Sequence, residues 1–352
     1  MLLKSFRYLT LPLSFVYGIV IKLRNLLYDK NILKSASFNF PIICVGNLAV
    51  GGTGKTPMTE YIIQLLGNRY QIATLSRGYK RKTTGFAIAN ENTTAIEIGD
   101  EPMQFHQKFP HITVAVGEER LVAIPQLLHQ RPQTQCIILD VAFQHRQVKA
   151  GLNSLLTDFK NLYTRDFMLP AGDLRDVRSS SKRAQCIVVT KCKSSLSIEE
   201  SRAIIKELNP HEQQQVFFSE IQYGMPYHLF SRQTINMDTN TQVLLITGIA
   251  NPRPIQEFLN KHVHSYDMLR YADHHIFDSD DLKDIQNQYS KMNATEAIIL
   301  TTEKDAVRLQ KFEPQLKDYP IYAIPIQHHL LFDGGKAFEE MLCTFIQSYT
   351  SK

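Results

Sequence analysis

A glycine-rich segment near residue 50 combines residue types that bind phosphate groups. It follows the short apolar run 42–45 and consists of Gly51, Gly52, Thr53, Gly54, Lys55 and Thr56. In such a loop the glycines let backbone N–H groups converge on phosphate oxygens, the lysine reaches the β and γ phosphates, and the threonine hydroxyl binds Mg²⁺. We therefore expect ATP or GTP, together with Mg²⁺, as the ligands of this segment.

The flanking sequence supports this interpretation, although Ala49 stands where the strict phosphate-loop pattern has its first glycine. An apolar strand precedes the loop, and residues 58–66 have the apolar spacing of a helix. The remaining glycines provide the backbone freedom that the loop needs. A glycine-rich turn between strand and helix that binds no ligand is the alternative.

One carboxylate is placed to complete a magnesium site. Asp140 ends the apolar run Cys136–Asp140, beyond the loop in the sequence. Nucleotide enzymes hold Mg²⁺, or its water, with a carboxylate at the end of such a strand. We expect Asp140 and Thr56 to act together as metal ligands, and the alternative is an aspartate that caps the next helix.

Two other segments contain candidate proton acceptors. Asp100 lies in an expected tight turn after the strand-like run 95–98, and taken alone this segment is only a turn. His274 lies in the Asp-His-His sequence 273–275, where a histidine beside a carboxylate can act as a general base or orient one. Adjacent histidines usually point apart and no third ligand lies at metal spacing, so a zinc site is disfavoured.

Basic residues at the ends of expected strands can hold phosphates through bidentate contacts, or can be ordinary surface charges. These residues are Arg77, Arg120 and Arg175. Residues 301–305 also follow a strand, but they lack the Asn-Lys-x-Asp order with which GTPases recognise guanine. GTPase switching is therefore disfavoured.

The elements that must position these residues alternate between strands and helices. Helical patterns such as 121–129 separate apolar runs that predict strands at 71–79, 111–116, 136–140, 151–158 and 185–190. Apolar strands alternating with helices predict a mainly parallel sheet with helices on both faces, and ligands then bind at the carboxyl ends of the strands. We expect an α/β domain of the P-loop NTPase type.

A second, smaller α/β unit follows the segments 217–221 and 226–230, which we expect to be extended connections. A helix is predicted at 254–263, a closing helix at 331–349, and strands at 243–249, 297–301 and 320–324. The expected division is an N-terminal helix at 1–34, a nucleotide-binding domain at 35–222 and a C-terminal α/β domain at 223–352.

Composition limits the classes of function. The 352 residues are 43% hydrophobic and 21% charged, which indicates a globular chain long enough for two domains. A net charge of +5 suits a phosphorylated substrate or an anionic membrane surface and is no signature of nucleic-acid binding. The five cysteines are scattered, mostly in apolar runs, and indicate a reducing compartment without a disulfide framework.

The N-terminal segment 8–21 is apolar and uncharged, with Lys4 and Arg7 before it and Lys22 and Arg24 after it. It is shorter than the roughly 20 residues with which a helix spans a bilayer. No small-x-small cleavage site follows it, which disfavours a signal peptide. We expect a helix at the membrane interface, with its apolar side in lipid and its basic residues at the headgroups, and a buried helix is the alternative.

Taken together, the motifs resemble the tetraacyldisaccharide 4'-kinase family of the lipid A pathway. The resemblance extends in order over nearly the whole chain, through the segments 45–57, 76–79, 99–102, 116–120, 143–145, 169–176, 248–252, 273–275 and 302–306. It implies a Gram-negative source and an enzyme that uses ATP and Mg²⁺ to phosphorylate the 4'-hydroxyl of an acylated glucosamine disaccharide 1-phosphate, giving lipid IV-A. The implied location is the cytoplasmic face of the bacterial inner membrane, with no protein partner and no nucleic acid.

The resemblance also implies roles for individual residues. Lys55 and Thr56 would hold the β and γ phosphates and Mg²⁺, while Asp100 and His274 would together receive the proton of the 4'-hydroxyl. Arg120 would contact the 1-phosphate of the substrate, and the N-terminal segment would shelter its acyl chains. The implied substrate contacts are Arg77, Arg120, Gln144, His145, Arg175 and Asp176.

One position departs from the family pattern, which usually has two consecutive aspartates where this chain has Asp140 and Val141. Valine can neither bind Mg²⁺ nor accept a proton. We expect Asp140, Thr56 and water to suffice, and the alternatives are a slow enzyme or a degenerate copy. The rival functions are a membrane-associated P-loop assembly or motor ATPase and a soluble nucleotide kinase with a buried N-terminal helix.

Overall fold

The computed structural model of the chain describes residues 7–140, 142–292 and 297–350. Packing divides the chain into two compact units. The first unit contains the described residues up to 92, residues 105–222 and the described residues from 327 onward. The second unit contains residues 93–104 and the described part of 223–326.

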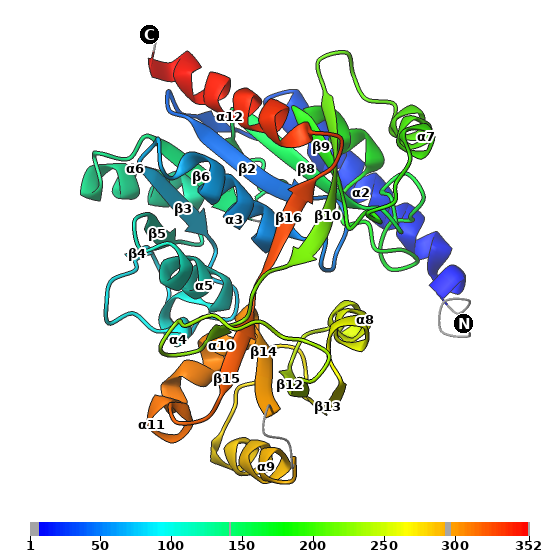
Figure 1. Cartoon of the computed structure of the whole chain (residues 1–352). Helices are drawn as coiled ribbons and strands as arrows, with labels where there is room; N and C mark the ends of the chain where they lie inside the picture. Colours follow the sequence, from blue (N-terminus) through cyan, green and yellow to red (C-terminus); the bar gives the residue numbers. More distant parts are fainter. Residues whose placement is uncertain (1–6, 141, 293–296, 351–352) are drawn as a thin grey trace. The chain divides into compact units, whose positions relative to one another are not determined.

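A nine-stranded, mostly parallel sheet forms the centre of the first unit (Figure 1). Its strands are β2 (Ile42–Asn47), β3 (Ile72–Ser76), β4 (Ala87–Ile88), β5 (Thr113–Val116), β6 (Cys136–Asp140), β8 (Leu152–Asp158), β9 (Cys186–Thr190), β10 (Gln215–Tyr223) and β16 (Ile326–Leu330). They lie in the order β16-β10-β9-β8-β2-β6-β3-β5-β4. Every neighbouring pair from β10 to β5 is parallel, so the carboxyl ends of these strands meet at one edge.

The central strands of this sheet are buried because helices cover both of its faces. All six positions of β2 are buried, as a strand in the middle of a parallel sheet requires. The helices are α2 (Leu11–Asp29) with the preceding turn η1 (Tyr8–Thr10), α3 (Lys55–Leu66), α6 (Arg120–Gln130), η2 (Arg178–Arg183), α7 (Ile198–Leu208) and α12 (Gly334–Thr350). A separate two-stranded ribbon joins β1 (Ala36–Ser37) to β7 (Val148–Lys149).

A smaller five-stranded sheet forms the second unit. Its strands are β11 (Tyr227–His228), β12 (Gln242–Thr247), β13 (Ser265–Arg270), β14 (Ala297–Thr302) and β15 (Ile321–Ile324), in the order β11-β15-β14-β12-β13, and only β11 is antiparallel to its neighbour. Its helices are α4 (Ala95–Ile98), α8 (Arg253–His262), α9 (Ser279–Ser290), α10 (Glu303–Leu309), η3 (Gln310–Phe312) and α11 (Glu313–Leu316). Helix α5 (Asp100–Lys108) begins in this unit and ends in the first.

Alternate residues of β12 face two different cores of the second unit. Leu244 and Ile246 belong to a core cluster that includes residues of α9 and α10, whereas Val243 and Leu245 belong to one that includes residues of α8. The sheet is therefore covered on both faces, which confirms the expected second α/β unit.

The unit boundaries differ from the expected division in two segments. The chain leaves the first unit after residue 222, where we expected a boundary, but residues from 327 onward return to it. The reason is that β16 joins the large sheet beside β10, and Phe338 of α12 packs its ring 5.1 Å from that of Phe217. Thr93–Gln104 belongs with the second unit rather than with the nucleotide-binding domain.

Three local expectations were wrong. Residues 95–98 form the helical turn α4 rather than a strand, because Thr94 and Glu97 make a capping box in which the Thr94 N–H donates to the Glu97 carboxylate at 2.7 Å. The following segment is the first turn of α5 rather than a tight turn. Residues 217–221 lie within strand β10 instead of an extended connection.

The N-terminal helix is longer than its uncharged part. Residues 8–29 form one stretch of 22 residues that is long and apolar enough to cross a membrane, by length and composition alone. The uncharged run 8–21 by itself was expected to be too short for this. The helix packs within the first unit rather than forming a separate domain.

Candidate active site

The phosphate loop connects β2 to α3 with the geometry of an anion site. Gly51 and Gly54 have φ values of 96° and 84°, a region in which side chains other than glycine are strained. Helix α3 begins at Lys55, and the first N–H groups of a helix have no partner within it. These N–H groups and the helix dipole favour a bound phosphate, as the sequence predicted.

The lysine of the loop lies across it. The Lys55 ammonium is 3.4 Å from the Gly51 carbonyl oxygen, so the positive charge stays beside the backbone that would surround the phosphates. The loop residues Gly51 to Thr56 therefore fit a nucleotide triphosphate, with a flexible cation able to follow the β and γ phosphates.

Asp140 faces helix α3 from the end of the neighbouring strand β6. Its Oδ1 atom accepts a hydrogen bond from the Thr59 hydroxyl at 3.3 Å, and the carboxylate is buried. Thr56 lies three residues before Thr59 and so shares that side of the helix. A carboxylate and a hydroxyl are the hard oxygen ligands that Mg²⁺ uses when phosphates and water supply the others.

Two further observations bear on how a metal ion could be held. Val141 lies outside the described residues. Within the described part of the chain, no group of three or more histidine, cysteine, aspartate or glutamate side chains could hold a metal ion. A dedicated metal cage is thus absent from the described residues, and Mg²⁺ would be held jointly with the nucleotide.

Arginines from separate elements surround His145 in the first unit. Burial lowers the pKa of His145 to about 4, and positive charges add to this effect in the order Arg120, Arg77, Arg175 and Arg24. His145 is therefore neutral at physiological pH. The structure brings together four of the six expected substrate residues in a region of positive potential.

Arg120 is the least compensated member of this cluster. Its side chain lies at the start of α6 with 4% exposure, and Nη1 donates to the Glu118 carbonyl oxygen at 3.3 Å. Its Nε and Nη2 atoms have no hydrogen-bond partner among the described residues. Burial, and then the charge of Arg77, lower the pKa of Arg120. Buried and unsatisfied guanidinium groups are strong sites for an anionic ligand.

Arg175 and Gln144 are held against the start of the phosphate loop. Arg175 Nη2 donates to Asn47 Oδ1 at 2.9 Å, and the Gln144 amide donates to the Asn47 carbonyl oxygen. Asn47 is the last residue of β2, so both side chains lie near the loop. The substrate roles expected of Arg175 and Gln144 stay predictions.

Asp176, another of the expected substrate residues, is engaged by side chains of the first unit. It is 1% exposed and receives hydrogen bonds from Arg183, Asn25 and Ser180, each at 2.8 Å. These contacts tie α2 to the segment that contains η2. The carboxylate is already satisfied within the protein, which a sequence pattern cannot reveal.

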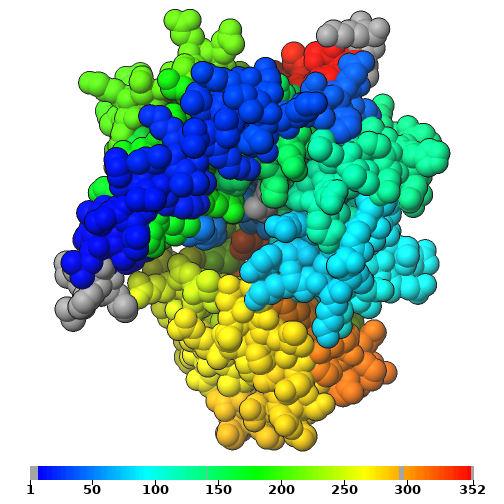
Figure 2. Space-filling model, turned by 180° about the vertical axis from the view of Figure 1, so that it is seen from behind, coloured from blue at the N-terminus to red at the C-terminus, as the bar shows by residue number. Residues whose placement is uncertain are grey.

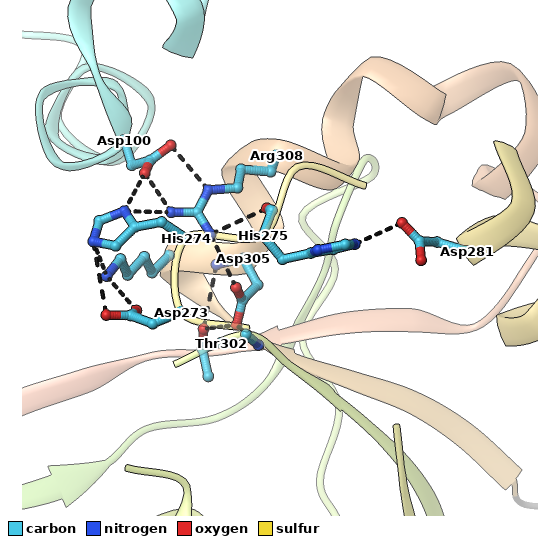
Figure 3. Close-up of polar contacts among 10 residues, drawn as sticks. Asp100, Asp273, His274, His275, Asp281, Thr302, Asp305 and Arg308 are labelled. Carbon is cyan, nitrogen blue, oxygen red and sulfur yellow. Dashed lines mark hydrogen bonds and ion pairs between the residues drawn. The ribbon is translucent and has the colours of Figure 1, made fainter. Parts of the chain in front are cut away.

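In the second unit, Asp100, His274 and Arg308 converge from three separate segments (Figure 3). His274 Nδ1 lies 3.1 Å from Asp100 Oδ2. Arg308 Nε donates to Asp100 Oδ1 at 3.0 Å, and its Nη2 donates to Asp100 Oδ2, which makes a bidentate pair. The expected pairing of Asp100 with His274 is therefore present.

The charge of Asp100 is set by opposing effects. Burial acts to raise its pKa, but the hydrogen bonds and charge of Arg308, together with those of His274, lower the pKa below its ordinary value. Asp100 is thus an ionised acceptor at neutral pH, in a site that excludes much of the water.

Lys304 lies on the other side of the His274 ring. Its ammonium is 3.0 Å from His274 Nε2 and 3.2 Å from Asp273 Oδ1. With the proton on Nδ1 the ring donates toward Asp100 and Nε2 accepts from Lys304, while Arg308 Nη2, which donates to Asp100, lies 2.9 Å from the same Nδ1. His274 also has φ of 63°, a left-handed conformation that non-glycine residues rarely adopt and that is concentrated at functional sites.

Arg308 and Lys304 escaped the sequence analysis, although Lys304 lies in the segment 302–306 that the resemblance includes and Arg308 follows it by two residues. They are four residues apart on α10 and share one face of the helix. Asp305 lies beside them and accepts from the Gly248 N–H at 3.0 Å and from the Thr302 hydroxyl at 2.7 Å. A helical reading of residues 303–309 would have placed the two cations together.

His275 points away from this cluster, as expected for adjacent histidines. Its Nε2 lies 2.7 Å from Asp281 Oδ2, and its ring stacks on Tyr271 with centroids 4.7 Å apart. Of the two histidines, His274 is the one that contacts Asp100.

Comparison with known proteins agrees with these features. The family model described as Tetraacyldisaccharide-1-P 4'-kinase matches residues 6–347. A tetraacyldisaccharide 4'-kinase of Flavobacterium johnsoniae is 47% identical over 93% of this chain and 95% of its own length. One of Bacteroides thetaiotaomicron is 42% identical over 96% of this chain and 93% of its own length.

A solved structure is similar over almost the same extent. LpxK from Aquifex aeolicus, crystallised in complex with ATP, matches with a TM-score of 0.74 and 27% identity, and the match covers 97% of this chain and 99% of that one. Its fold supports the P-loop α/β architecture described above. From the extent of the family match and the identity to these relatives, the chain belongs to the tetraacyldisaccharide-1-P 4'-kinase family.

Proposed function

We propose that this chain performs the reaction of its family with Asp100 as the proton acceptor and the phosphate loop as the ATP site. The γ-phosphate of ATP is transferred to the 4'-hydroxyl of a tetraacylated glucosamine disaccharide 1-phosphate. The observation that carries the proposal is the half-buried Asp100 carboxylate, which Arg308 and His274 keep ionised.

The nucleotide would be bound by the residues of the first unit. The N–H groups at the start of α3 and the Lys55 ammonium would hold the β and γ phosphates. Thr56 and Asp140 would hold Mg²⁺, which neutralises phosphate charge when bound. Phosphoryl transfer depends on such positioning and charge neutralisation more than on covalent help from the protein.

Asp100 accounts for the acceptor half of the reaction. As the 4'-oxygen bonds to the γ-phosphorus, the bond from that phosphorus to the bridging oxygen breaks and ADP leaves. The hydroxyl proton passes to the Asp100 carboxylate. His274 orients the carboxylate through Nδ1, and the bidentate contact with Arg308 fixes its plane.

The arginine cluster of the first unit suits the other phosphate of the substrate. Arg120 is buried and keeps unsatisfied N–H groups, while Arg77, Arg175 and neutral His145 lie around it. An anion there would relieve both the repulsion among the arginines and the unsatisfied donors. We assign the 1-phosphate to this cluster.

Helix α2 would place the enzyme on the inner membrane, at its cytoplasmic face where ATP is available. One side of the helix is fastened to the protein: Asn25 binds Asp176, and the Ser14 hydroxyl accepts from the Ala171 N–H at 2.9 Å. The other side exposes Phe15, Val16 and Leu23 by 72%, 58% and 55%. The helix lies along the surface of the first unit (Figure 2), which supports contact with lipid from one side.

The direct test is transfer of labelled γ-phosphate from ATP to tetraacylated glucosamine disaccharide 1-phosphate in detergent micelles. We expect a bisphosphorylated lipid whose formation requires Mg²⁺, and an Asp100→Asn variant that is slower by about 100-fold or more because it cannot accept the proton. ATP hydrolysis that is rapid without the acceptor and unchanged by it would contradict the kinase proposal and favour the motor ATPase.

The pH dependence of the reaction tests the role of Arg308. In an Arg308→Met variant, burial is no longer opposed by the guanidinium, so the pKa of Asp100 rises. Because only the ionised carboxylate accepts a proton, the acid limb of the kcat/KM profile should move to higher pH. The matched control is Arg270→Met, at an exposed position at the end of β13. Identical acid limbs in wild type and Arg308→Met would refute the proposed role.

Substitution of Arg120 tests the assignment of the 1-phosphate. Arg120→Met should raise KM for the disaccharide by about 10- to 100-fold, the usual cost of losing hydrogen bonds to a charged group. KM for ATP should not change. For an acceptor that lacks the 1-phosphate, the variant and the wild type should have the same KM. An exposed arginine in the same unit, Arg131, gives the control Arg131→Met. Equal losses with both acceptors would count against the assignment.

Flotation with vesicles of phosphatidylethanolamine and phosphatidylglycerol tests the lipid contact of α2. Each exposed apolar side chain contributes about 1.5–3 kcal/mol when it enters lipid, so Phe15→Ser with Leu23→Ser should weaken binding by about 100-fold. Ile198→Ser, at a side chain 53% exposed on α7, is the control. Unchanged flotation, or resistance to alkaline extraction, would overturn the interfacial arrangement.

A further inference from the structure

Three successive carbonyl groups of the phosphate loop accept hydrogen bonds from side chains outside the loop. The Lys191 ammonium donates to the Gly52 carbonyl oxygen, and the Thr190 hydroxyl donates to that of Thr53 at 2.9 Å. His328 Nε2 lies 3.0 Å from the Gly54 carbonyl oxygen. Lys191 and Thr190 lie at the carboxyl end of β9, whereas His328 comes from strand β16 near the other end of the chain.

Holding these carbonyl groups determines the direction of the next N–H groups. A peptide unit is planar and trans, so its C=O and the N–H of the following residue point in opposite directions. When a side chain outside the loop holds a carbonyl group, the N–H of the following residue therefore points away from that side chain. For Thr53 and Gly54, these are the N–H groups of Gly54 and Lys55, which begin the anion site.

His328 is held at both ring nitrogens. The ring is 2% exposed, and its Nδ1 lies 2.8 Å from the hydroxyl oxygen of Ser219, which is fully buried on the adjacent strand β10. A carbonyl oxygen can only accept, so Nε2 must carry the proton and Nδ1 must accept from the Ser219 hydroxyl. Burial lowers the pKa of His328 to about 4, which keeps this neutral tautomer at physiological pH.

The contact acts on the most constrained residue of the loop. Gly54 has φ of 84° and is the N-cap residue of α3, and a Cβ atom there would lie 3.0 Å from His328 Nε2. Its carbonyl also accepts the Met58 N–H at 3.1 Å. The imidazole thus fits directly against a glycine whose conformation is unfavourable for other residues and whose carbonyl belongs to the first turn of the helix.

We propose that His328 is a positioning residue of the ATP site, which fixes the Gly54 peptide so that the N–H groups at the start of α3 face the phosphates. This inference rests on the proposed function, because it assumes that ATP occupies the loop. His328 does not touch the nucleotide in this scheme and acts only through the backbone of Gly54.

Two variants of similar size separate hydrogen bonding from packing. His328→Gln places an amide N–H where Nε2 lies, whereas His328→Leu fills the space without a donor. The matched control is His329→Leu, because the next side chain along β16 is 55% exposed and contacts Glu220 at 3.2 Å rather than the loop. Thermal unfolding of each variant shows whether it is folded.

The measurements are the Kd for ATP with Mg²⁺ by calorimetry, and the steady-state constants for phosphate transfer. We expect His328→Leu to raise Kd and KM for ATP by about tenfold, the equivalent of one hydrogen bond of average to high strength. Its KM for the lipid acceptor should not change. His328→Gln should remain within about threefold of wild type, and His329→Leu should match it.

Other results would overturn the inference. Equal ATP affinity in His328→Leu and wild type would show that the loop does not need the contact. Equal losses in the Leu and Gln variants would show that only the shape of the ring matters. Direct ATP binding keeps this test separate from the proposed reaction, because a wild-type protein that binds ATP and phosphorylates no disaccharide would refute the reaction alone.

Discussion

Parallel strand pairing is the constraint on which the chemistry of both units depends. Parallel strands end at the same edge, so residues that follow different strands are gathered without any long excursion of the chain. In the first unit this edge holds the phosphate loop after β2, Asp140 at the end of β6 and Lys191 after β9. In the second unit Gly248 follows β12 and Thr302 ends β14, and both bind Asp305.

The two units differ in how they treat buried charge. The first unit concentrates arginines and leaves the donors of Arg120 unsatisfied, an arrangement that costs stability until an anion is present. The second unit pairs its charges internally, with Asp100 between Arg308 and His274 and Asp305 beneath Arg308. The first arrangement suits recognition of a phosphorylated ligand, whereas the second keeps one carboxylate ionised and ready to accept a proton.

The sequence alone predicted those parts of the site whose residues lie within one short segment. The phosphate loop, the strand that ends at Asp140 and the α/β class follow from local residue types and periodicity, and the structure bears them out. The resemblance also joined Asp100 to His274, which local patterns could not have done. Arg308 and His328 were missed because they meet partners 208 and 274 positions away, and distances in the sequence carry no signal of such contacts.

The errors have local physical causes. The capping box of Thr94 and Glu97 makes a helix of residues that alternate like a strand. Strand β16 follows a proline and contains two histidines, so its apolar pattern is too weak to predict the edge strand that it forms.

The return of the C-terminal segment to the first unit has a consequence for synthesis on the ribosome. The nucleotide-binding sheet is complete only when β16 has been added beside β10, and β16 follows every other strand of that sheet in the sequence. The second unit, its segment 93–104 included, is translated before residues 327–330. Nascent chains therefore contain Asp100, His274 and Arg308 before they contain His328, and the large sheet cannot be completed before β16 is translated.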